Sequence, residues 1–256
     1  MSAIEHLSIV RDQAFPGEWY DASDPSHFWF RWRMAVLRQA LREAGAETLA
    51  PWRALDVGCG SGVLAGQLEK ATAWTVDGTD LNLEALDRCR PRRGRTFYYD
   101  VTEEHPGMRE KYDAVVLFDI LEHLPDPRAF VVSAVRHLRP GGLLLVNVPA
   151  LPSLTSAYDR AAGHLRRYTR ASLAKEMAGL GLEERSLRYW GLCLIPLLLL
   201  RKALLARGGP RVIDRGFRPF LPGANRLLTG LSWVETSLWH TPPLGTSAMY
   251  LGRRTS

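Results

Sequence analysis

The 256-residue sequence predicts an α/β fold: a doubly wound, mostly parallel sheet of seven strands, with a helical insertion near the C-terminus. Between residues 51 and 149, short apolar runs alternate with helix-like stretches, which is the pattern of a parallel sheet covered by helices. The run LLLVNVP has no polar alternation, which is typical of a strand buried on both faces. With 46% hydrophobic residues, the chain can bury a substantial core.

Each strand of the first half is followed by a helix or a turn signal. The expected strands are RALDVG, AWTVDGTD, RTFYYDV, YDAVVLFDIL and LLLVNVP. The expected helices are GVLAGQLEKA, NLEALDRCR with Asn82 or Asp80 as its cap, and DPRAFVVSAVRHL, which we expect to stop at RPGG. Further on, RASLAKEMAGLGL reads as a helix, and EERSLRYWG and TSAMYLGRR read as the last two strands.

Outside these elements we expect three segments with special roles. Residues 1–50 form an N-terminal helical lid, and residues 51–256 form the main domain. Residues 150–169 are rich in polar and small side chains, so we place them as an active-site loop over the carboxyl ends of the strands. Residues 191–243 form the helical insertion.

The insertion contains the one stretch that suggests a membrane. Its uncharged run, residues 189–200, is too short to span a bilayer, which takes about 20 apolar residues. Together with nearby arginines, including Arg211, Arg215 and Arg218, it fits a helix that lies in a lipid interface. A buried cap helix over an acceptor pocket explains the leucines as well, and we favour that reading.

Charge and cysteine content restrict the partners and the compartment. The formal charge of +6 suits anionic partners such as phosphorylated compounds, acidic lipids or nucleic acid. The three cysteines, Cys59, Cys89 and Cys193, have no CxxC spacing, so neither a disulfide framework nor a zinc site is expected. A reducing cytoplasm fits best, with peripheral membrane contact as an addition, and MSAIEHLSIVRDQAF does not have the pattern of a secretory signal.

The stretch LDVGCGSG places Gly58, Gly60 and Gly62 directly after a strand that contains Asp56. Glycines at such a strand-to-helix turn let backbone N–H groups approach a ligand, because no side chain stands in the way. On this motif alone, a purely structural turn or a dinucleotide site remains open. The glycine loop predicts a nucleotide-type ligand at the end of the first strand.

Acidic residues also end the next three strands. Asp80 lies where a carboxylate can accept both hydroxyls of a ribose, and Asp100 lies where one can accept from an exocyclic amine. Asp119 ends the fourth strand. Four such strand ends in order indicate one shared site at the carboxyl edge of the sheet.

The motifs LDVGCGSG, VDGTD, YYDV, FDILEHLPD and LRPGGLLLVNVP resemble those of class I S-adenosylmethionine-dependent methyltransferases, which have a Rossmann-like fold, over about residues 51–149. This resemblance implies that the glycine loop wraps the methionine and ribose of the cofactor, that Asp80 holds the ribose, and that Asp100 and Val101 meet the adenine. A nicotinamide dehydrogenase would more usually show Gly-x-Gly-x-x-Gly. The cofactor residues that we expect are Asp56, Gly58, Cys59, Gly60, Gly62, Asp80, Leu81, Asp100, Val101, Asp119, Ile120, His123 and Arg33.

The outer segments HFWFRWR and GHLRRYT are similar to those of a less characterised subgroup of these enzymes. In HFWFRWR, a helix would place Arg33 one turn from Trp29 and could bring Arg33 to the cofactor carboxylate, while Trp29 meets the substrate. Packing of this helix on the sheet is the alternative for each aromatic side chain.

Methyl transfer to a hydroxyl needs positioning and removal of a proton. The expected base is His164, with Asp159 and Tyr168 as further candidates, because histidine titrates near neutral pH. Arg166, Arg167 and Arg170 suit an anionic acceptor, and we expect one of the first two to bind it. No metal is expected, since His123 lacks HExxH spacing.

The leading interpretation is therefore a methyltransferase for a small-molecule or lipid-linked acceptor, acting on oxygen, with nitrogen and carbon left open. A nucleic-acid methyltransferase is the alternative that the basic charge suggests, although no RNA-binding module or PPY-type motif is present. A non-catalytic protein that keeps the fold is the third alternative. The sequence leaves the oligomeric state open.

Overall fold

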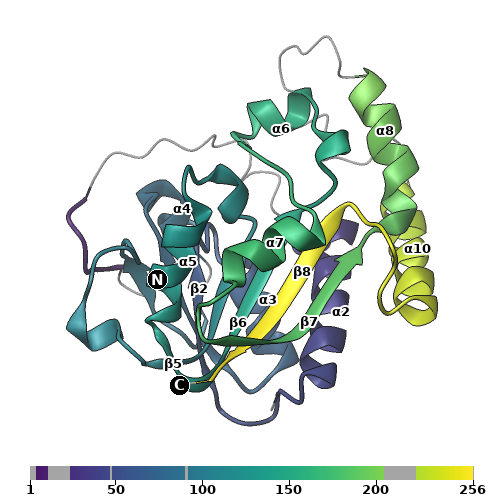
Figure 1. Cartoon of the computed structure of the whole chain (residues 1–256). Helices are drawn as coiled ribbons and strands as arrows, with labels where there is room; N and C mark the ends of the chain where they lie inside the picture. Colours follow the sequence, from purple (N-terminus) through teal and green to yellow (C-terminus); the bar gives the residue numbers. More distant parts are fainter. Residues whose placement is uncertain (1–3, 11–23, 47, 90–91, 205–222, 256) are drawn as a thin grey trace.

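The sheet is the framework of the molecule. The computed structural model describes residues 4–10, 24–46, 48–89, 92–204 and 223–255. Over these residues the chain forms one eight-stranded sheet in the order β1-β4-β3-β2-β5-β6-β8-β7 (Figure 1). The strands are β1 (Ile4–His6), β2 (Arg53–Val57), β3 (Thr75–Asp80), β4 (Thr96–Tyr98), β5 (Tyr112–Phe118), β6 (Leu138–Pro149), β7 (Leu182–Trp190) and β8 (Ser247–Arg254).

The topology confirms the predicted fold class. Strands β1 to β6 pair in parallel, whereas β8 pairs antiparallel with both β6 and β7. Strand order reverses direction at β2, which lies between β3 and β5, so a crevice opens there at the carboxyl ends of the strands. This switch point positions the site described below.

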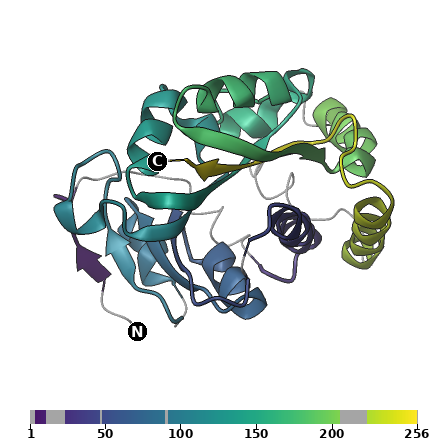
Figure 2. The same cartoon turned by 60° about the horizontal axis from the view of Figure 1, so that its bottom comes forward.

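Two layers of helices cover the sheet, as doubly wound folds require. One core includes side chains of α2 (Phe28–Glu43) and α3 (Val63–Ala71), and the core on the other face includes side chains of α5 (Pro127–Val135) and α7 (Arg170–Met177). Figure 2 shows α2 and α3 on one side of the sheet and α5 and α7 on the other. Two short helices are α4 (Leu83–Asp87) and α6 (Ala157–Ala161), and the Asn82 side chain caps α4, as predicted.

Two further helices lie at the β7 edge (Figure 1). They are α8 (Ile195–Leu204), after the 3₁₀ turn Leu192–Leu194, and α10 (Ala224–Leu238), which packs against α2. Within the described residues, no helix is both long enough and apolar enough to cross a membrane. Arg211, Arg215 and Arg218 lie outside the described residues.

The structure corrects several expectations about elements. The chain has an eighth strand, β1, inside the segment expected to be a helical lid, and β1 pairs with β4. The helix α5 ends at Val135, before RPGG, and RPGG belongs to β6, where the register with β5 shifts between Tyr112 and Ala114. The glycines therefore form an irregularity in a strand instead of a helix stop.

Residues 150–169, which we expected to be a loop, contain regular structure. Residues 150–169 contain a 3₁₀ turn, Pro152–Leu154, and helix α6, which begins with a capping box between Ser156 and Asp159. Residue Ala150 bridges to Tyr168, so the two ends of the segment are joined. The polar residues that suggested a loop are the ones that cap and anchor it.

Candidate active site

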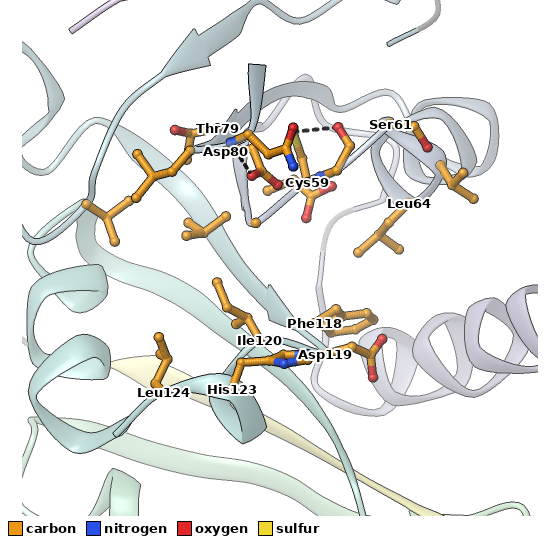
Figure 3. Close-up of a pocket in the computed structure, with 18 of the residues that line it drawn as sticks. Cys59, Ser61, Leu64, Thr79, Asp80, Phe118, Asp119, Ile120, His123 and Leu124 are labelled. Atoms are coloured by element: carbon orange, nitrogen blue, oxygen red, sulfur yellow. Dashed lines mark hydrogen bonds between the residues drawn. The ribbon is translucent and has the colours of Figure 1, made fainter. Parts of the chain in front are cut away.

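A cavity of about 320 Å³ lies at the carboxyl ends of β2, β3, β4 and β5 and is closed on one side by the start of α2. Its size falls at the lower end of the range for ligand pockets, about 300–1,000 Å³. Figure 3 shows side chains of the glycine loop facing those of the β5 end across the cavity. Every residue predicted to bind the cofactor lines it except Gly62, which begins α3 behind the loop.

The glycine loop needs its glycines for two reasons. Gly58, Gly60 and Gly62 have φ angles of +68°, +52° and +76°, which favour residues without a side chain. A Cβ atom on Gly58 would also lie 2.7 Å from Cδ1 of Ile120, across the crevice. The loop therefore brings main chain to the cavity wall, and a side chain at Gly58 would force the end of the Ile120 side chain to shift.

Asp80 joins the loop to the next strand. Its carboxylate accepts hydrogen bonds from the backbone N–H groups of Gly60 (2.8 Å) and Asn82 (2.9 Å). Burial raises the pKa of Asp80, and the backbone N–H bonds oppose that shift. With both oxygens fixed at the cavity wall, the carboxylate keeps lone pairs for hydroxyl groups of a ligand.

Asp100 lies at the end of β4, on the same wall. One of its oxygens, Oδ1, accepts hydrogen bonds from both the backbone N–H (2.9 Å) and the hydroxyl (2.6 Å) of Thr102. These bonds fix the orientation of the carboxylate. Val101 is buried and lines the cavity beside it, so this corner offers an acceptor next to an apolar surface.

The Asp56 carboxylate has incomplete hydrogen bonding. Its side chain is buried at the cavity, and its Oδ2 has no hydrogen-bond partner among the described residues. Burial raises the pKa of Asp56 to about 7, although Arg92 and Arg33 counteract the shift. An unpaired buried carboxylate oxygen is costly without a ligand, so this atom is suited to accept from a bound cationic or N–H group.

Arg33 reaches the cavity from α2 and pairs with Asp119 at the end of β5. Its Nη1 donates to Oδ2 of Asp119 at 2.5 Å, and Asn147 donates to the other oxygen at 2.8 Å. The guanidinium lies over the rings of Trp29 and Phe118, at 4.7 and 5.3 Å from their centres. Aromatic rings of α2 and β5 thus orient a buried cation beside the cavity.

Burial raises the pKa of Asp119, while the Arg33 charge holds it back. Because this pair already satisfies Oδ2 of Asp119 and Asn147 takes Oδ1, Arg33 is positioned by protein groups before any ligand binds. Its Nε is buried and has no hydrogen-bond partner among the described residues.

The predicted base, His164, lies directly behind the cavity wall. Its ring centre is 4.9 Å from that of His123, which lines the cavity, and the two rings meet edge to face. The Nδ1 atom of His164 is 3.0 Å from Oδ1 of Asp159, so the proton assigned to Nδ1 leaves Nε2 as the basic nitrogen. Burial and the neighbouring His164 charge lower the pKa of His123 to about 4.

Asp159 and Arg167 support His164 and do not line the cavity. Arg167 Nε donates to Oδ1 of Asp159 at 2.8 Å, and its Nη1 donates to the carbonyl of Ala150 at 3.0 Å. Burial opposes ionisation of Asp159, but hydrogen bonds and charge from His164 and Arg167 hold its pKa well below the usual range. Asp159 is thus an orienting group for His164, and its basicity is too low for a proton acceptor.

Three other predicted residues also have structural partners. The Tyr168 hydroxyl is buried and donates to the carbonyl of Leu121 at 3.2 Å, and burial raises its pKa, so it is a poor base. Arg166 is turned away and donates to the carbonyl of Pro125 at 3.1 Å. Arg170 lies over the Tyr189 ring at 5.1 Å. None of these three residues lines the cavity.

Glu122 was not predicted as a site residue, yet it lies next to both histidines. It is buried, its Oε2 has no hydrogen-bond partner among the described residues, and its donor atom and those of His123 and His164 lie within 4.8 Å of one another. This donor set could hold a metal ion. Burial raises the pKa of Glu122 well above its usual range, which favours the protonated acid. The expectation of no metal stays a prediction.

Sequence reasoning also missed the rest of the cavity lining, which is mostly apolar. The side chains concerned come from the first helix, the glycine loop and the ends of strands, and they are Phe30, Val57, Ser61, Val63, Leu64, Thr79, Asn82, Tyr99, Phe118, Leu124 and Phe130. Most of these residues lie one or two positions from a predicted residue, so closeness in the sequence was the signal that could have found them. Phe130 lies on α5, and only the fold brings it here.

Comparison with known proteins identifies relatives of this architecture. A family model described as a methyltransferase domain matches residues 28–187. Ubiquinone biosynthesis O-methyltransferases of Klebsiella pneumoniae subsp. pneumoniae and Pectobacterium carotovorum subsp. carotovorum are 30% identical over 148 residues and 32% identical over 151 residues. Each match covers 54% of this chain and 59% of the relative, so the chain matches less than two thirds of these relatives' length.

Solved structures agree on the fold. Phosphoethanolamine N-methyltransferase 2 of Haemonchus contortus, in complex with S-adenosyl-L-methionine, has a TM-score of 0.55 at 16% identity, covering 86% of this chain and 52% of that one. An S-adenosylmethionine-dependent methyltransferase from Mesorhizobium loti has a TM-score of 0.53 at 16% identity, covering 84% and 96%. At these identities the likeness concerns the fold alone.

Proposed function

Because this chain belongs to the methyltransferase-domain family, we propose that it transfers a methyl group from S-adenosylmethionine to an oxygen atom of a small or lipid-linked acceptor. The observation that carries the proposal is the cavity at the switch point of the sheet, with a bare glycine loop on one side and four carboxylates along its wall. Such a wall favours a ligand that carries hydroxyl, amine and cationic groups along its length.

The residues present fit S-adenosylmethionine. The orphaned Oδ2 of buried Asp56 would accept from the methionine ammonium, which supplies the missing partner. Asp80 would accept from the ribose hydroxyls, and the free lone pairs of Asp100 would accept from the adenine amine, with Val101 against the ring. Arg33 would meet the methionine carboxylate near its present partner Asp119.

When bound, S-adenosylmethionine supplies an electrophilic methyl group on a sulfonium, and positioning of the acceptor in line with it provides most of the acceleration. The chain's part is to orient the acceptor and to take its proton. His164 is the proposed base, because Asp159 holds its Nδ1 side and leaves Nε2 for a hydroxyl proton. Arg167 keeps Asp159 ionised and is therefore a positioning residue.

The acceptor would approach past His123 and the aromatic start of α2, where Trp29 lines the cavity. The name of the ubiquinone biosynthesis relatives favours oxygen as the atom methylated and a lipid-linked acceptor. An acceptor of that kind is collected at a membrane surface, so the proposal includes peripheral membrane contact. Of the arginines predicted for substrate, Arg166 is the one left near the surface, while Arg167 is committed to Asp159.

The first experiment is calorimetric titration with S-adenosylmethionine and S-adenosylhomocysteine. We expect saturable binding that Asp80→Ala weakens about tenfold or more, since it removes charge-assisted hydrogen bonds worth about 1.5–3 kcal/mol each. Asp87→Ala is the matched control, because this carboxylate is exposed on α4 and should leave binding unchanged. A folded wild-type protein that binds neither compound would refute the proposal and support a non-catalytic role.

The second experiment measures production of S-adenosylhomocysteine with hydroxyl-bearing acceptors, with and without a lipid tail. His164→Gln should lower kcat by about 10²–10⁴-fold while leaving the Kd for S-adenosylmethionine unchanged. Equal kcat values for the wild type and this variant would exclude His164 as the base. The same assay with RNA at low and high salt tests the nucleic-acid alternative.

A further inference from the structure

Helix α10 turns a mostly polar side toward the protein. Its two buried side chains are Ser232 and Glu235, and Leu228 is its one leucine that packs, partly buried, against the core. On the opposite side Leu227, Leu231, Val234 and Leu238 repeat at a helical spacing, and all four are exposed, Leu227 and Leu238 by about two thirds (67% and 70%). A helix packed on a domain normally has the reverse arrangement.

Hydrogen bonds fix α10 in this orientation. The Glu235 carboxylate accepts from the backbone N–H groups of Gly191 (2.7 Å), Leu192 (3.2 Å) and Cys193 (2.9 Å), and so caps the turn that precedes α8. At the other end, Oδ1 of Asn225 accepts from the backbone N–H of Phe28 at 2.7 Å, the first residue of α2. Rotation of α10 to bury its leucines would break all of these bonds, so the apolar stripe is held outward.

The apolar surface continues beyond the stripe. Trp233 on α10 is 72% exposed, and Trp239 directly after the helix is exposed as well. Leu199, Leu200 and Leu204 are exposed on α8, which lies at the same edge of the molecule in both views (Figures 1 and 2). Here we call the exposed apolar side chains of α8 and α10 the outer face. Several large apolar side chains exposed at one edge of a domain are typical of a binding surface.

The charges on α8 and α10 indicate which kind of partner would bind the outer face. The only acidic residue on α8 and α10 is the buried Glu235, whereas Arg226 is exposed at the start of α10. In the last turn of α8, the half-buried Lys202 donates to the carbonyl of Ser153 at 2.7 Å, while Arg201 is turned inward over the Tyr158 ring at 4.3 Å. Leucines and tryptophans flanked by cations, with no exposed carboxylate on either helix, match an anionic lipid surface. A second copy of the chain would bring the same cations together and gain no opposite charge.

We propose that the outer face binds the surface of an anionic lipid membrane, with Trp233 and the stripe of α10 inserted among the headgroups. This contact would place the cavity beside the lipid, since Asn225 holds the first residue of α2 and the next two, Trp29 and Phe30, line the cavity. Only that delivery of a lipid-linked acceptor rests on the proposed methyl transfer. The docking surface itself does not depend on it.

The test is co-sedimentation of the full chain with vesicles of phosphatidylcholine alone or of phosphatidylcholine mixed with phosphatidylglycerol. We expect binding to the mixed vesicles, weakened by salt, with a blue shift of tryptophan emission. The double variant Leu231→Glu, Leu238→Glu should lower the bound fraction about tenfold or more, because each carboxylate would enter an anionic interface. Leu49→Glu, at an 89% exposed leucine before β2, is the matched control and should bind like the wild type.

Absence of wild-type binding to the mixed vesicles would overturn the proposal, as would unchanged binding of the double variant. A dimer that the double variant dissociates, without vesicle binding, would assign the outer face to a second copy instead and would also overturn it. Titration of the same proteins with S-adenosylmethionine separates the two proposals. Vesicle binding without cofactor binding would leave the docking surface standing and the methyl transfer refuted.

Discussion

Replacement of Asp159 by asparagine tests whether the His164 side of the site depends on one buried carboxylate. Each of its oxygens has two donors: Oδ2 accepts from the backbone N–H (2.8 Å) and hydroxyl (2.9 Å) of Ser156, and Oδ1 accepts from His164 (3.0 Å) and Arg167 (2.8 Å). An amide has only one acceptor oxygen, so either orientation turns an NH₂ group toward two donors.

The loss of stability depends on which of these four donors can reorient. The Ser156 hydroxyl can rotate and His164 can change tautomer, but the Ser156 backbone N–H and the Arg167 guanidinium cannot. Arg167 would also become a buried cation without its ion-pair partner, its side chain being 4% exposed. Loss of one member of a buried ion pair costs about 3–5 kcal/mol, and we expect a loss of this size in the free energy of unfolding.

The assay is urea denaturation at pH 7, with Asp87→Asn as the exposed control, which should change stability by less than about 0.5 kcal/mol. The variant Asp159→Asn, Arg167→Gln removes the stranded charge and should recover part of the loss. Because the folded-state pKa of Asp159 is depressed, its stabilising contribution is present above about pH 4 and is lost as pH falls toward the folded-state pKa. A loss below about 1 kcal/mol for Asp159→Asn would refute this account of the cluster.

Two further predictions concern the cavity wall. Gly58→Ala should destabilise the protein by about 1 kcal/mol more than Gly45→Ala and should weaken S-adenosylmethionine binding. Both glycines have positive φ and share that backbone strain, but a Cβ on Gly58 lies 2.7 Å from the Cδ1 end of Ile120, which must shift, whereas a Cβ on Gly45 meets nothing within 4 Å. Equal unfolding free energies for the two variants would contradict the steric argument. Burial raises the pKa of Asp56 to about 7, so the unfolded state releases this proton first and stability should fall by about 4 kcal/mol as pH rises from about 4 to about 7. Asp56→Asn should flatten that part of the pH–stability curve measured by thermal or urea unfolding, and an unchanged curve would assign the pH dependence to other groups.

Much of the fold could be predicted because its signals are local. A buried parallel strand is a short apolar run, and the helix between two such runs follows from periodicity and from caps such as Asn82. Strand β1 was missed because three residues at a sheet edge have neither period nor length. RPGG was misassigned because glycines after a helix resemble a stop signal, and only the pairing of β6 with β5 shows that they lie within a strand.

The cofactor wall was predictable for the same reason, since its residues follow directly from strand ends, and parallel strands bring their carboxyl ends to one edge. The roles of individual charges were not predictable. Arg33 and Asp119 are 86 positions apart, and their ion pair exists because α2 crosses the end of β5. Likewise, the polar segment 150–169 gave no indication in the sequence that the Asp159 carboxylate would bind both His164 and Arg167.

The sequence by itself determined the class of fold, the edge of the sheet that carries the site and the family of its ligand, because strand ends, glycine turns and caps are encoded within a few residues. Only the tertiary structure decided which polar groups are buried together and which apolar groups stay outside. Helix α10 shows the reason most clearly: its apolar stripe would predict burial, but the partners of Glu235 lie on the turn before α8, and those long-range hydrogen bonds turn the leucines outward.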